Sequence, residues 1–401
     1  MARELHGVGR GAHRQREVTL HGLDERERAL VRFARRLVAT PSLSGEEHQV
    51  ARLVASELRR LGYRNVTVDR AGNVLGSLGP GRARLMFNGH LDHVPPAGML
   101  DPYDARIELS ERPGGSAPVL RGRGSCDMKA NVAAGVYAAA FLEPETKLQA
   151  AFVFTADVQE ETDSPAGVRA LLAEGLRADY GISGEATELG VAVGHRGKAQ
   201  FDVIVAGRAS HASTPELGSN AVFRAVPFLR ALEQAQAGLG DDPLFGPATL
   251  TVTRIESQPH GDVAVVPSAC VIRVDRRYLP GESAESAHRE LQAIVAQTAE
   301  RERVPARVEL VDDYPLMSTP LDDPVVAAGR DAVAAVMGES PTMRTWRFGV
   351  NATFMNAAGI PSIGIGAGDE SCAHTDEEHV DVDQLVASSR IYAELIRRLC
   401  T

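Results

Sequence analysis

Cysteine is scarce in this chain. Its 401 residues include four cysteines, Cys126, Cys270, Cys372 and Cys400, and no two of them form a CxxC pair. Their separation argues against a disulfide framework and excludes the close spacing of a cysteine zinc knuckle. Because reduced thiols are typical of cytoplasmic proteins, we expect a cytoplasmic location.

Long apolar runs are also missing. No stretch approaches the ~20 apolar residues of a membrane span, which argues against a membrane protein. Residues 1–22 are rich in Arg, His and Gly and lack the apolar run of a signal peptide. We therefore expect a flexible N-terminal arm over residues 1–22.

Positive charge is in deficit, because the formal net charge is -10. Such a surface repels phosphate backbones, so we expect no nucleic-acid partner. Aromatic residues make up only 5% of the chain, which disfavours an aromatic-rich binding module. The hydrophobic fraction of 44% and the 38 glycines instead suit an α/β enzyme with well-buried cores and tight turns. A chain this long predicts two domains.

Short apolar segments alternate with helical patterns over the first half of the chain. Residues 66–68, 85–87 and 151–154 are predicted strands, and residues 24–37, 47–58 and 129–140 are predicted helices. This alternation predicts an α/β domain on a doubly wound, mixed but largely parallel sheet that helices cover on both faces.

The pattern changes after Gly194. Residues 199–205 alternate with period two, and they precede a helix (220–235), two strands (249–255 and 270–274), a helix (282–301) and a strand near Val308. This βαββαβ order predicts a small α+β domain with a four-stranded antiparallel sheet. Since the doubly wound pattern resumes after about residue 312, we expect residues 23–194 and 312–401 to form one domain, and residues 195–311 to form a domain inserted into it.

A histidine and an aspartate follow the strand at residues 85–87. Period two places His90 and Asp92 on one side of an extended segment, at the strand end where open parallel sheets form their clefts. A histidine with a carboxylate partner is a common arrangement at metal sites. Taken alone, the pair is a weak signal, and a polar surface loop is the more common explanation.

Other polar residues follow other predicted strands. Asp127, in the segment GRGSCDMK, leads into a helix, where an N-cap would explain it as well as a metal ligand. Glu160 and Glu161 are adjacent carboxylates that repel each other, and a cation would relieve this repulsion while one of them stays a base. Glu185 and His374 each follow a further short strand, although a lone histidine is more often structural.

These sites are more informative together than separately. Each falls where the sheet places the carboxyl ends of its strands. Two histidines and three carboxylates suit two metal ions that share a bridging carboxylate. Imidazole and carboxylate ligands favour Zn²⁺, with Mn²⁺ or Co²⁺ as alternatives.

The same motifs resemble those of the acetylornithine deacetylase, succinyl-diaminopimelate desuccinylase and glutamate carboxypeptidase group of co-catalytic zinc hydrolases. The resemblance rests on the HxD, GRGxxDMK, paired Glu, GE[AP]T and late AH motifs, and it extends from about residue 25 to 400. It implies a zinc-hydrolase catalytic domain, an inserted lid and dimerisation domain, a small carboxylate-bearing substrate and a homodimer formed through the lid.

The resemblance also implies a ligand set for two Zn²⁺ ions. Asp127 would bridge both ions. His90 and Glu185 would complete one site, and Glu161 and His374 the other. Glu160 would be the general acid and base.

Residues around the metal site take roles from the same resemblance. Asp92 would orient His90, and Arg277 in the segment VDRR would bind the substrate carboxylate. His211 in the segment GRASHAS would stabilise the oxyanion, and because exposed sheet edges invite pairing we expect it to act from a partner subunit. Asn351 in the segment FGVN is a weaker substrate-binding candidate, with an ordinary polar turn as the alternative.

The sequence also departs from the family pattern. Gln159 stands where many members have Asp, and the lid lacks the usual Asn near Val265. The N-terminal arm is longer than expected. The segments Gly194–Lys198, 275–277 and 366–370 are most similar to a poorly characterised hydrolase branch linked to selenium metabolism, so the substrates of the deacetylases transfer weakly.

We predict hydrolysis of an N-acyl amino acid or a small peptide-like amide. A dipeptidase or carboxypeptidase with the same machinery is the nearest alternative. A dinuclear phosphoesterase normally needs more histidines and an Asn ligand. A lid-mediated dimer that binds metal without turnover would have no use for the base that Glu160 provides.

Overall fold

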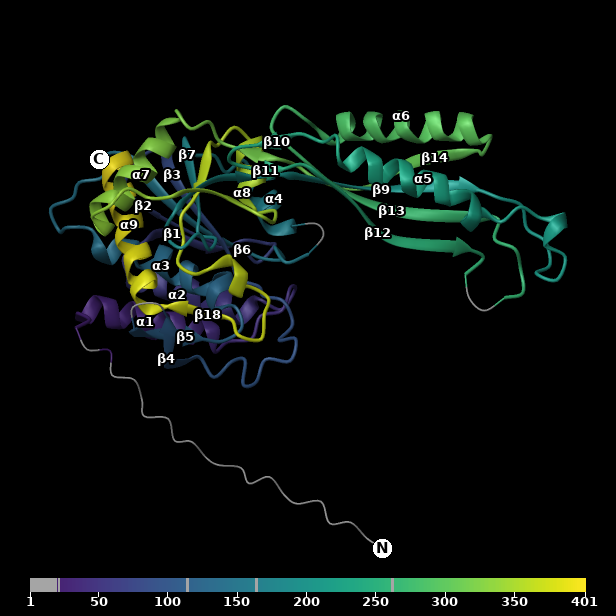
Figure 1. The fold of residues 1–401 in the computed structure, drawn as a ribbon. Coiled ribbons are helices and arrows are strands. Elements are labelled where there is room, and N and C mark those ends of the chain that lie inside the picture. The colour runs from purple at the N-terminus through teal and green to yellow at the C-terminus, as the bar shows by residue number, and fades with distance from the viewer. Residues whose placement is uncertain (1–19, 21, 113–114, 163–164, 261–262) are drawn as a thin grey trace, which may run out of the picture.

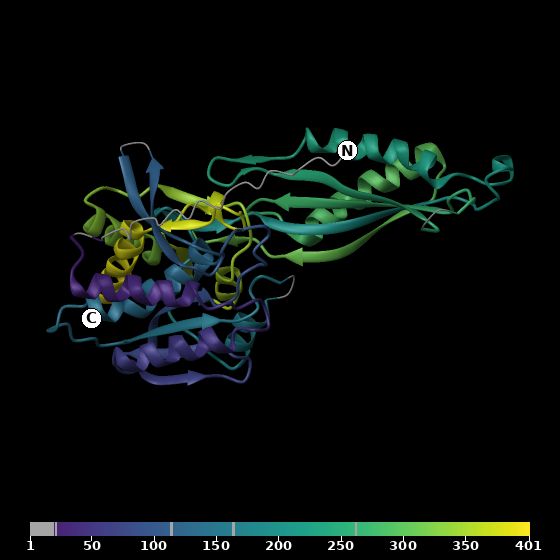
Figure 2. The same ribbon diagram turned by 90° about the horizontal axis from the view of Figure 1, so that it is seen from below.

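The computed structural model describes residues 20, 22–112, 115–162, 165–260 and 263–401. The predicted N-terminal arm therefore lies almost wholly outside the described residues. The described part forms a main unit and a four-stranded unit (residues 197–314), which projects from the side of the main unit in both views (Figures 1 and 2). None of its helices combines the length and the apolar character needed to cross a bilayer.

A mixed sheet of nine strands forms the centre of the main unit, as predicted, in the order β1-β2-β6-β3-β7-β17-β8-β15 with β16 paired to β8. Its strands are β1 (Arg64–Val68), β2 (Val74–Leu78), β3 (Ala83–His90), β6 (Ala151–Asp157), β7 (Tyr180–Ser183), β8 (Val191–His195), β15 (Met317–Ser318), β16 (Met343–Trp346) and β17 (Ser362–Gly364). The central strands β6, β3, β7 and β17 are parallel.

The sheet is less uniformly parallel than predicted, because β1, β2 and β15 pair antiparallel with their neighbours. At one end, β1 and β2 form a hairpin. Asp69 closes its turn by accepting hydrogen bonds from the N–H groups of Gly72 and Asn73, both at 2.9 Å. Antiparallel strands need only a short connection of this kind. The predicted alternation of strands and helices did not reveal this hairpin.

Helices cover both faces of this sheet. One face packs into the main core against α1 (Glu25–Val38), α2 (His48–Arg60), α3 (Ala130–Tyr137), α7 (Pro324–Met337) and α9 (Val382–Cys400). The other face packs against α4 (Ala166–Ala173) and α8 (Ala352–Ala357). Helix α1 begins as the sequence predicts, because Asp24 and Glu27 form a capping box.

The four-stranded unit has the predicted βαββαβ order and a fully antiparallel sheet, β12-β13-β9-β14. Its elements are β9 (Gly197–Ala206), α5 (Ala221–Gln236), β12 (Thr249–Gln258), β13 (Ala269–Tyr278), α6 (Ala284–Glu302) and β14 (Ala306–Tyr314). Strand β9 alternates strictly between buried and half-buried residues, and its buried side packs in one core with α5 and α6. Strand β14 runs past residue 311, where we placed the end of the inserted domain.

Two smaller sheets were not predicted. Strands β4 (Arg106–Arg112), β5 (Gly115–Arg121) and β18 (His379–Asp381) form a three-stranded sheet in the order β18-β5-β4. Strands β10 (Asp241–Asp242) and β11 (Gly246–Pro247) form a short hairpin.

Candidate metal centre

Three neighbouring parallel strands bring polar side chains to one edge of the main sheet. Strand β3 ends at His90, β6 is followed by Glu161, and β7 is followed by Glu185. In the β3–β6 register His90 pairs with Asp157, so the two strands end level with each other. The carboxyl ends of parallel strands therefore meet here, as the sequence predicts.

Asp127 lies between the two predicted ligand histidines. Its Oδ1 atom is 2.9 Å from Nε2 of His90, and its Oδ2 atom is 3.1 Å from Nε2 of His374. Nε2 of His90 is also 3.7 Å from Oε1 of Glu185, and Nε2 of His374 is 2.9 Å from Oε1 of Glu161. Each oxygen of Asp127 thus faces a different imidazole, and each imidazole has a second carboxylate beside it.

The ionisation of these groups fits a centre that holds positive charge. Burial and repulsion from Glu185 and Glu161 raise the pKa of Glu160 well above its usual value. Burial, with repulsion from Asp127, raises the pKa of Glu185 to about 8. Hydrogen bonds to Asp127 and Glu161 raise the pKa of His374 to about 10. Clustered carboxylates that resist ionisation are relieved by a cation among them.

The donor set also fits a metal ion geometrically. Single donor atoms of His90, Asp127 and Glu161 all lie within 4.8 Å of one another. Nitrogen and carboxylate oxygen donors at such spacing suit Zn²⁺, Mn²⁺ or Co²⁺ better than Ca²⁺ or Mg²⁺, which prefer oxygen alone.

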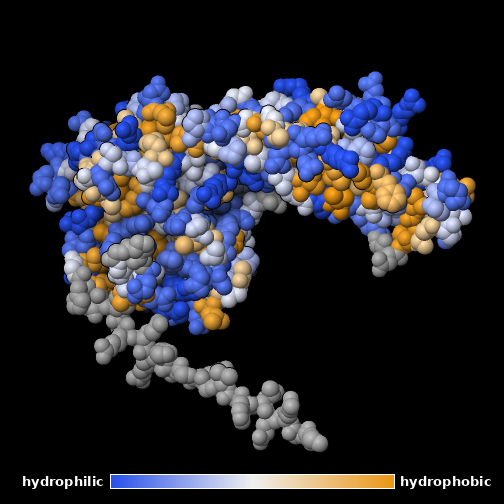
Figure 3. All heavy atoms as spheres, in the orientation of Figure 1, coloured by the Kyte–Doolittle hydropathy of each residue, from blue (hydrophilic) through white to orange (hydrophobic). Residues whose placement is uncertain are grey.

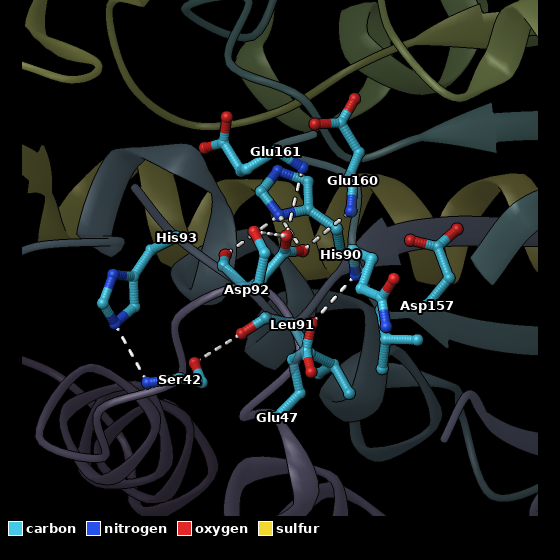
Figure 4. Close-up of polar contacts among 12 residues, drawn as sticks. Ser42, Glu47, His90, Leu91, Asp92, His93, Asp157, Glu160 and Glu161 are labelled. Carbon is cyan, nitrogen blue, oxygen red and sulfur yellow. Dashed lines mark hydrogen bonds and ion pairs between the residues drawn. The ribbon is translucent and has the colours of Figure 1, made fainter. Parts of the chain in front are cut away.

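Asp92 lies beside His90 and the paired glutamates, and several hydrogen bonds fix its position (Figure 4). Its carboxylate accepts hydrogen bonds from Ser44 Oγ at 2.7 Å and from the backbone N–H groups of Glu160 and Glu161 at 3.1 and 3.0 Å. Nδ1 of His90 is 3.0 Å from the backbone oxygen of Asp92 and 3.4 Å from its Oδ1 atom. Asp92 is fully buried and contacts both His90 and the paired glutamates.

A buried ion pair that was not predicted positions the loop that carries Asp127. Glu378 accepts hydrogen bonds from the backbone N–H groups of Cys126 and Asp127 at 3.0 and 3.1 Å. Its other carboxylate oxygen accepts from Nη1 of Arg123, and both side chains are 1% exposed. The two partners are 255 residues apart, which hides the pair from local pattern analysis.

The cluster opens into a cavity of about 680 Å³. Its lining includes the predicted acidic and histidine set: Asp127, Glu160, Glu161, Glu185 and His374. It also includes basic and aromatic side chains: Arg196, Lys198, Arg277, Arg347, Tyr314 and Phe348. Arg277, the predicted carboxylate-binding residue, is also held by Asp275, with Nε 2.8 Å from Oδ1. The same cavity therefore holds both cationic groups and the carboxylate cluster.

Asn351 does not line this cavity. It is 3% exposed, and its Nδ2 donates to both carboxylate oxygens of Asp157 at 3.0 and 3.1 Å. Nδ2 of Asn88 donates to the same carboxylate at 2.7 Å. The structure thus gives Asn351 a buried carboxylate as its partner, so the substrate contact that we expected is replaced by a link between α8 and the end of β6.

His211 lies away from the cavity of its own chain. It is exposed, and it belongs to the segment that follows β9. In Figure 1 this segment continues to the outer end of the four-stranded unit. The backbone N–H of Ser213 donates to its Nδ1 atom at 3.1 Å, which leaves the proton of a neutral ring on Nε2. In the described part of the chain, Nε2 has no hydrogen-bond partner. The side chain is therefore an exposed donor.

Comparison with known families and proteins gives consistent matches. Residues 86–398 match the profile of peptidase family M20/M25/M40. The chain is 31% identical over 388 residues to a protein of Escherichia coli K12 named uncharacterized protein YgeY, covering 91% of this chain and 93% of that one. It is also 31% identical over 336 residues to acetylornithine deacetylase of Myxococcus xanthus, covering 82% and 83%.

Solved structures share the fold. Aminopeptidase PepT from Bacillus cereus superposes with a TM-score of 0.74 at 23% identity, covering 93% of this chain and 98% of that one. The YxeP protein of Bacillus subtilis, described as a dinuclear metal binding peptidase, superposes with a TM-score of 0.71 at 16% identity, covering 94% and 98%.

Proposed function

This chain belongs to peptidase family M20/M25/M40, and from that premise we propose that it hydrolyses the amide bond of an N-acyl amino acid or a related small peptide-like substrate. The observation that carries the proposal is the position of Asp127, whose two carboxylate oxygens face His90 and His374. The acetylornithine deacetylase that aligns over most of the chain supports the choice of acyl amino acids.

Five residues would hold two metal ions. Asp127 would bridge them, His90 and Glu185 would complete one site, and Glu161 and His374 the other. Zn²⁺ suits these ligands best, with Co²⁺ or Mn²⁺ as alternatives. Asp92 would fix the orientation of His90 from behind, as hydrogen-bonded carboxylates do for ligand histidines.

When bound, the two ions would supply Lewis acidity that polarises the amide carbonyl and makes water easier to deprotonate. Glu160 would take the proton of the attacking water on a carboxylate oxygen and return it to the leaving amine nitrogen. Burial and the neighbouring carboxylates raise its pKa, which favours holding the proton until it passes to the amine. The backbone N–H contact with Asp92 holds Glu160 in place.

Arg277 would bind the substrate carboxylate with its planar, two-pronged guanidinium group. It lines the same cavity as the acidic cluster, so a substrate held there would present its amide to the metal ions and Glu160. The contact of Arg277 with Asp275 holds the guanidinium in a defined orientation.

A second copy of the chain would complete the site with His211. Strand β9 has ten residues, and at ~3.3 Å per residue it separates its ends by ~30 Å. Lys198 near one end of β9 lines the cavity, whereas His211 lies beyond the other end. The histidine of one subunit would therefore serve the cavity of another.

The surface of the four-stranded unit supports such a dimer. Hydrophobic side chains gather on the face of this unit seen in Figure 3. On α5, Val222, Phe223 and Val226 are 37, 76 and 43% exposed, and the neighbouring β12 is an edge strand of its sheet. Exposed edges pair readily with other chains, and exposed apolar helix faces mark association sites.

Cleavage of dipeptides is the alternative within the same mechanism. A cavity of about 680 Å³ has room for a dipeptide as well as for an acyl amino acid. Assays with N-acetyl and N-succinyl amino acids beside dipeptides and tripeptides would distinguish the two.

The test combines this substrate panel with metal analysis of the purified protein. We expect amide hydrolysis in wild type, two ions bound per chain, and loss of both metal and activity on chelation. A protein that hydrolyses no member of the panel when loaded with Zn²⁺, Co²⁺ or Mn²⁺ would overturn the proposal. Binding of a single ion at saturation would overturn the two-metal arrangement.

A further inference from the structure

One hydroxyl group in the cavity wall has no partner. Tyr314 is the last residue of β14 and lines the cavity. Its Oη atom is buried, and within the described part of the chain it makes no hydrogen bond. A buried, unpaired hydroxyl destabilises a folded protein, so its presence beside an active cavity points to a ligand that pairs with it.

Tyr314 belongs to a cross-strand row of donors. In the four-stranded sheet, Tyr314 on β14 pairs directly with Lys198 on β9, and Lys198 pairs with Arg277 on β13. Directly paired residues place their side chains on the same face of a sheet, and all three line the cavity. Lys198 pairs with Asp312 at 3.0 Å and Arg277 pairs with Asp275. Of these three side chains, Tyr314 alone finds no partner among the residues that the structure describes.

The ring of Tyr314 is fixed by packing. A Cβ atom added to Gly349 would lie 2.4 Å from its Cε1 atom, so the loop passes directly over the ring. Phe354 packs edge-on against it at 5.4 Å between centroids, and His195 lies at 5.7 Å. The hydroxyl therefore has one defined position without any hydrogen bond to hold it there.

The hydroxyl stays protonated and can act as a donor. Burial and the nearby carboxylates of Glu160 and Glu185 raise the pKa of Tyr314 far above its usual value. These carboxylates belong to the reacting end of the cavity, whereas Arg277 is two strands away, at a spacing of ~10 Å between the first and third strands of the row.

We propose that the Tyr314 hydroxyl donates a hydrogen bond to the acyl oxygen of the bound substrate, while Arg277 holds the carboxylate at the other end. The inference rests on the proposed function. Negative charge develops on the acyl oxygen during attack, so a fixed donor at this point would stabilise the transition state more than the substrate.

Tyr314→Phe tests the inference because it removes the hydroxyl and keeps the ring. We expect kcat/KM for the best substrate of the panel to fall by about 10- to 100-fold, mainly through kcat. The melting temperature without substrate should stay equal or rise, because no protein hydrogen bond is lost. Metal content should not change.

Tyr278→Phe is the matched control on the adjacent strand pair. The Tyr278 hydroxyl lies within hydrogen-bond distance of Asp313 Oδ1 at 3.3 Å and of the backbone oxygen of Tyr314 at 3.5 Å, and Tyr278 does not line the cavity. Its loss should lower the melting temperature and leave kcat/KM within about threefold, because it removes structural hydrogen bonds alone. Gly349→Ala, which displaces the Tyr314 ring, should reproduce the loss of kcat in a variant that keeps the hydroxyl.

Two results would overturn the inference while the proposed function stands. One is a Tyr314→Phe protein that melts below wild type, since its hydroxyl would then have a structural partner. The other is an unchanged kcat in an active wild-type background. A wild type that hydrolyses no amide would instead overturn the proposed function, and this inference with it.

Discussion

The backbone N–H of Glu161 donates a hydrogen bond to Oδ2 of Asp92 at 3.0 Å, across 69 residues of sequence. Oδ1 of the same carboxylate accepts from the backbone of Glu160 at 3.1 Å and lies 3.4 Å from Nδ1 of His90. One buried side chain thus links the histidine at the end of β3 to both glutamates that follow β6. The relative positions of His90, Glu161 and the proposed base Glu160 therefore depend on Asp92.

Asp92→Asn should weaken metal binding by ~10–100-fold, as loss of the carboxylate behind a ligand histidine does elsewhere. An amide must turn an NH2 group toward one of the backbone donors that the carboxylate now accepts from. Metal titration of the dialysed protein measures the effect. Ser44→Ala is the control, because it removes only the 2.7 Å hydrogen bond from the hydroxyl and should weaken binding much less. Wild-type affinity in Asp92→Asn would contradict the assigned role.

Glu160→Gln should bind both metal ions and lose ~10²–10⁴-fold in kcat, the contribution of a positioned general base. Its backbone contact with Asp92 does not involve the side chain, so the loop should keep its conformation. Turnover and metal content measured on the same preparation separate loss of the base from loss of the site. A metal-replete variant with near-normal kcat would show that another residue moves the proton.

Arg277→Lys should raise KM strongly for substrates with a free carboxylate and leave KM for the corresponding amides unchanged. Lysine keeps the charge but loses the planar, two-pronged geometry. Arg273→Lys is a matched control on the same strand, since Arg273 also pairs with an aspartate, Asp202, at 2.5 Å but does not line the cavity. Equal changes for acids and amides would indicate that Arg277 does not bind the carboxylate.

His195 should make stability depend on pH. Burial lowers its pKa from 6.5 to about 4, so the folded protein keeps it neutral where the unfolded chain protonates it. The stability that the neutral His195 contributes is fully present above pH ~6.5 and is lost as the pH falls toward 4. The resulting decrease in the free energy of unfolding reaches ~3 kcal/mol. Nε2 of His195 lies 2.5 Å from Thr353 Oγ1 and can accept its hydrogen bond only while unprotonated.

Urea unfolding between pH 7 and 5 measures this effect. His195→Gln should be less stable than wild type at pH 7 but lose less stability on acidification. His48→Gln, at an exposed histidine of α2, should keep the wild-type slope. Identical slopes in wild type and His195→Gln would rule out this origin of acid sensitivity.

Local patterns predicted much of the fold. Period two in β9 and the capping residue of α1 are properties of a few adjacent residues, so they are visible in the sequence. The three-stranded sheet was missed because β18 has only three residues and pairs with β5 more than 250 residues away. A pairing between strands this far apart in the chain leaves no local pattern in the sequence.

The candidate site likewise contains residues that local patterns identify and residues that they miss. His90 ends β3, and Glu161 and Glu185 follow β6 and β7, so their positions follow from the sheet. Asp127 and His374 lie outside these strand ends, and the folded chain brings them to the same place. Asn351 was expected at the substrate because the segment FGVN resembles a substrate-facing loop of the family. Its partner, Asp157, is 194 residues away and cannot be identified from spacing. Tyr314 was missed because its role depends on the lack of a partner in the folded chain.

His211 is a predicted site residue that does not line the cavity of its own chain. It lies past the far end of β9, and Ser213 holds its ring so that the outward Nε2 atom carries the proton. If it stabilises the oxyanion from a partner subunit, His211→Ala should lose ~10²–10³-fold in turnover, as for one oxyanion donor. Metal content should not change, because no proposed metal ligand contacts this loop.

Subunit exchange between two inactive variants tests the partner role directly. In a heterodimer of His211→Ala and Glu160→Gln chains, the cavity of the His211→Ala chain has an intact Glu160 and receives His211 from its partner. The other cavity lacks both groups. A symmetric dimer mixed one to one should therefore recover about a quarter of wild-type activity after exchange. If His211 served its own cavity, every cavity in the mixture would lack either the base or the histidine, and activity would not return. Exchange must be verified independently, for example by mass spectrometry of differently tagged chains. Verified exchange without recovery would then exclude catalysis by His211 across the dimer.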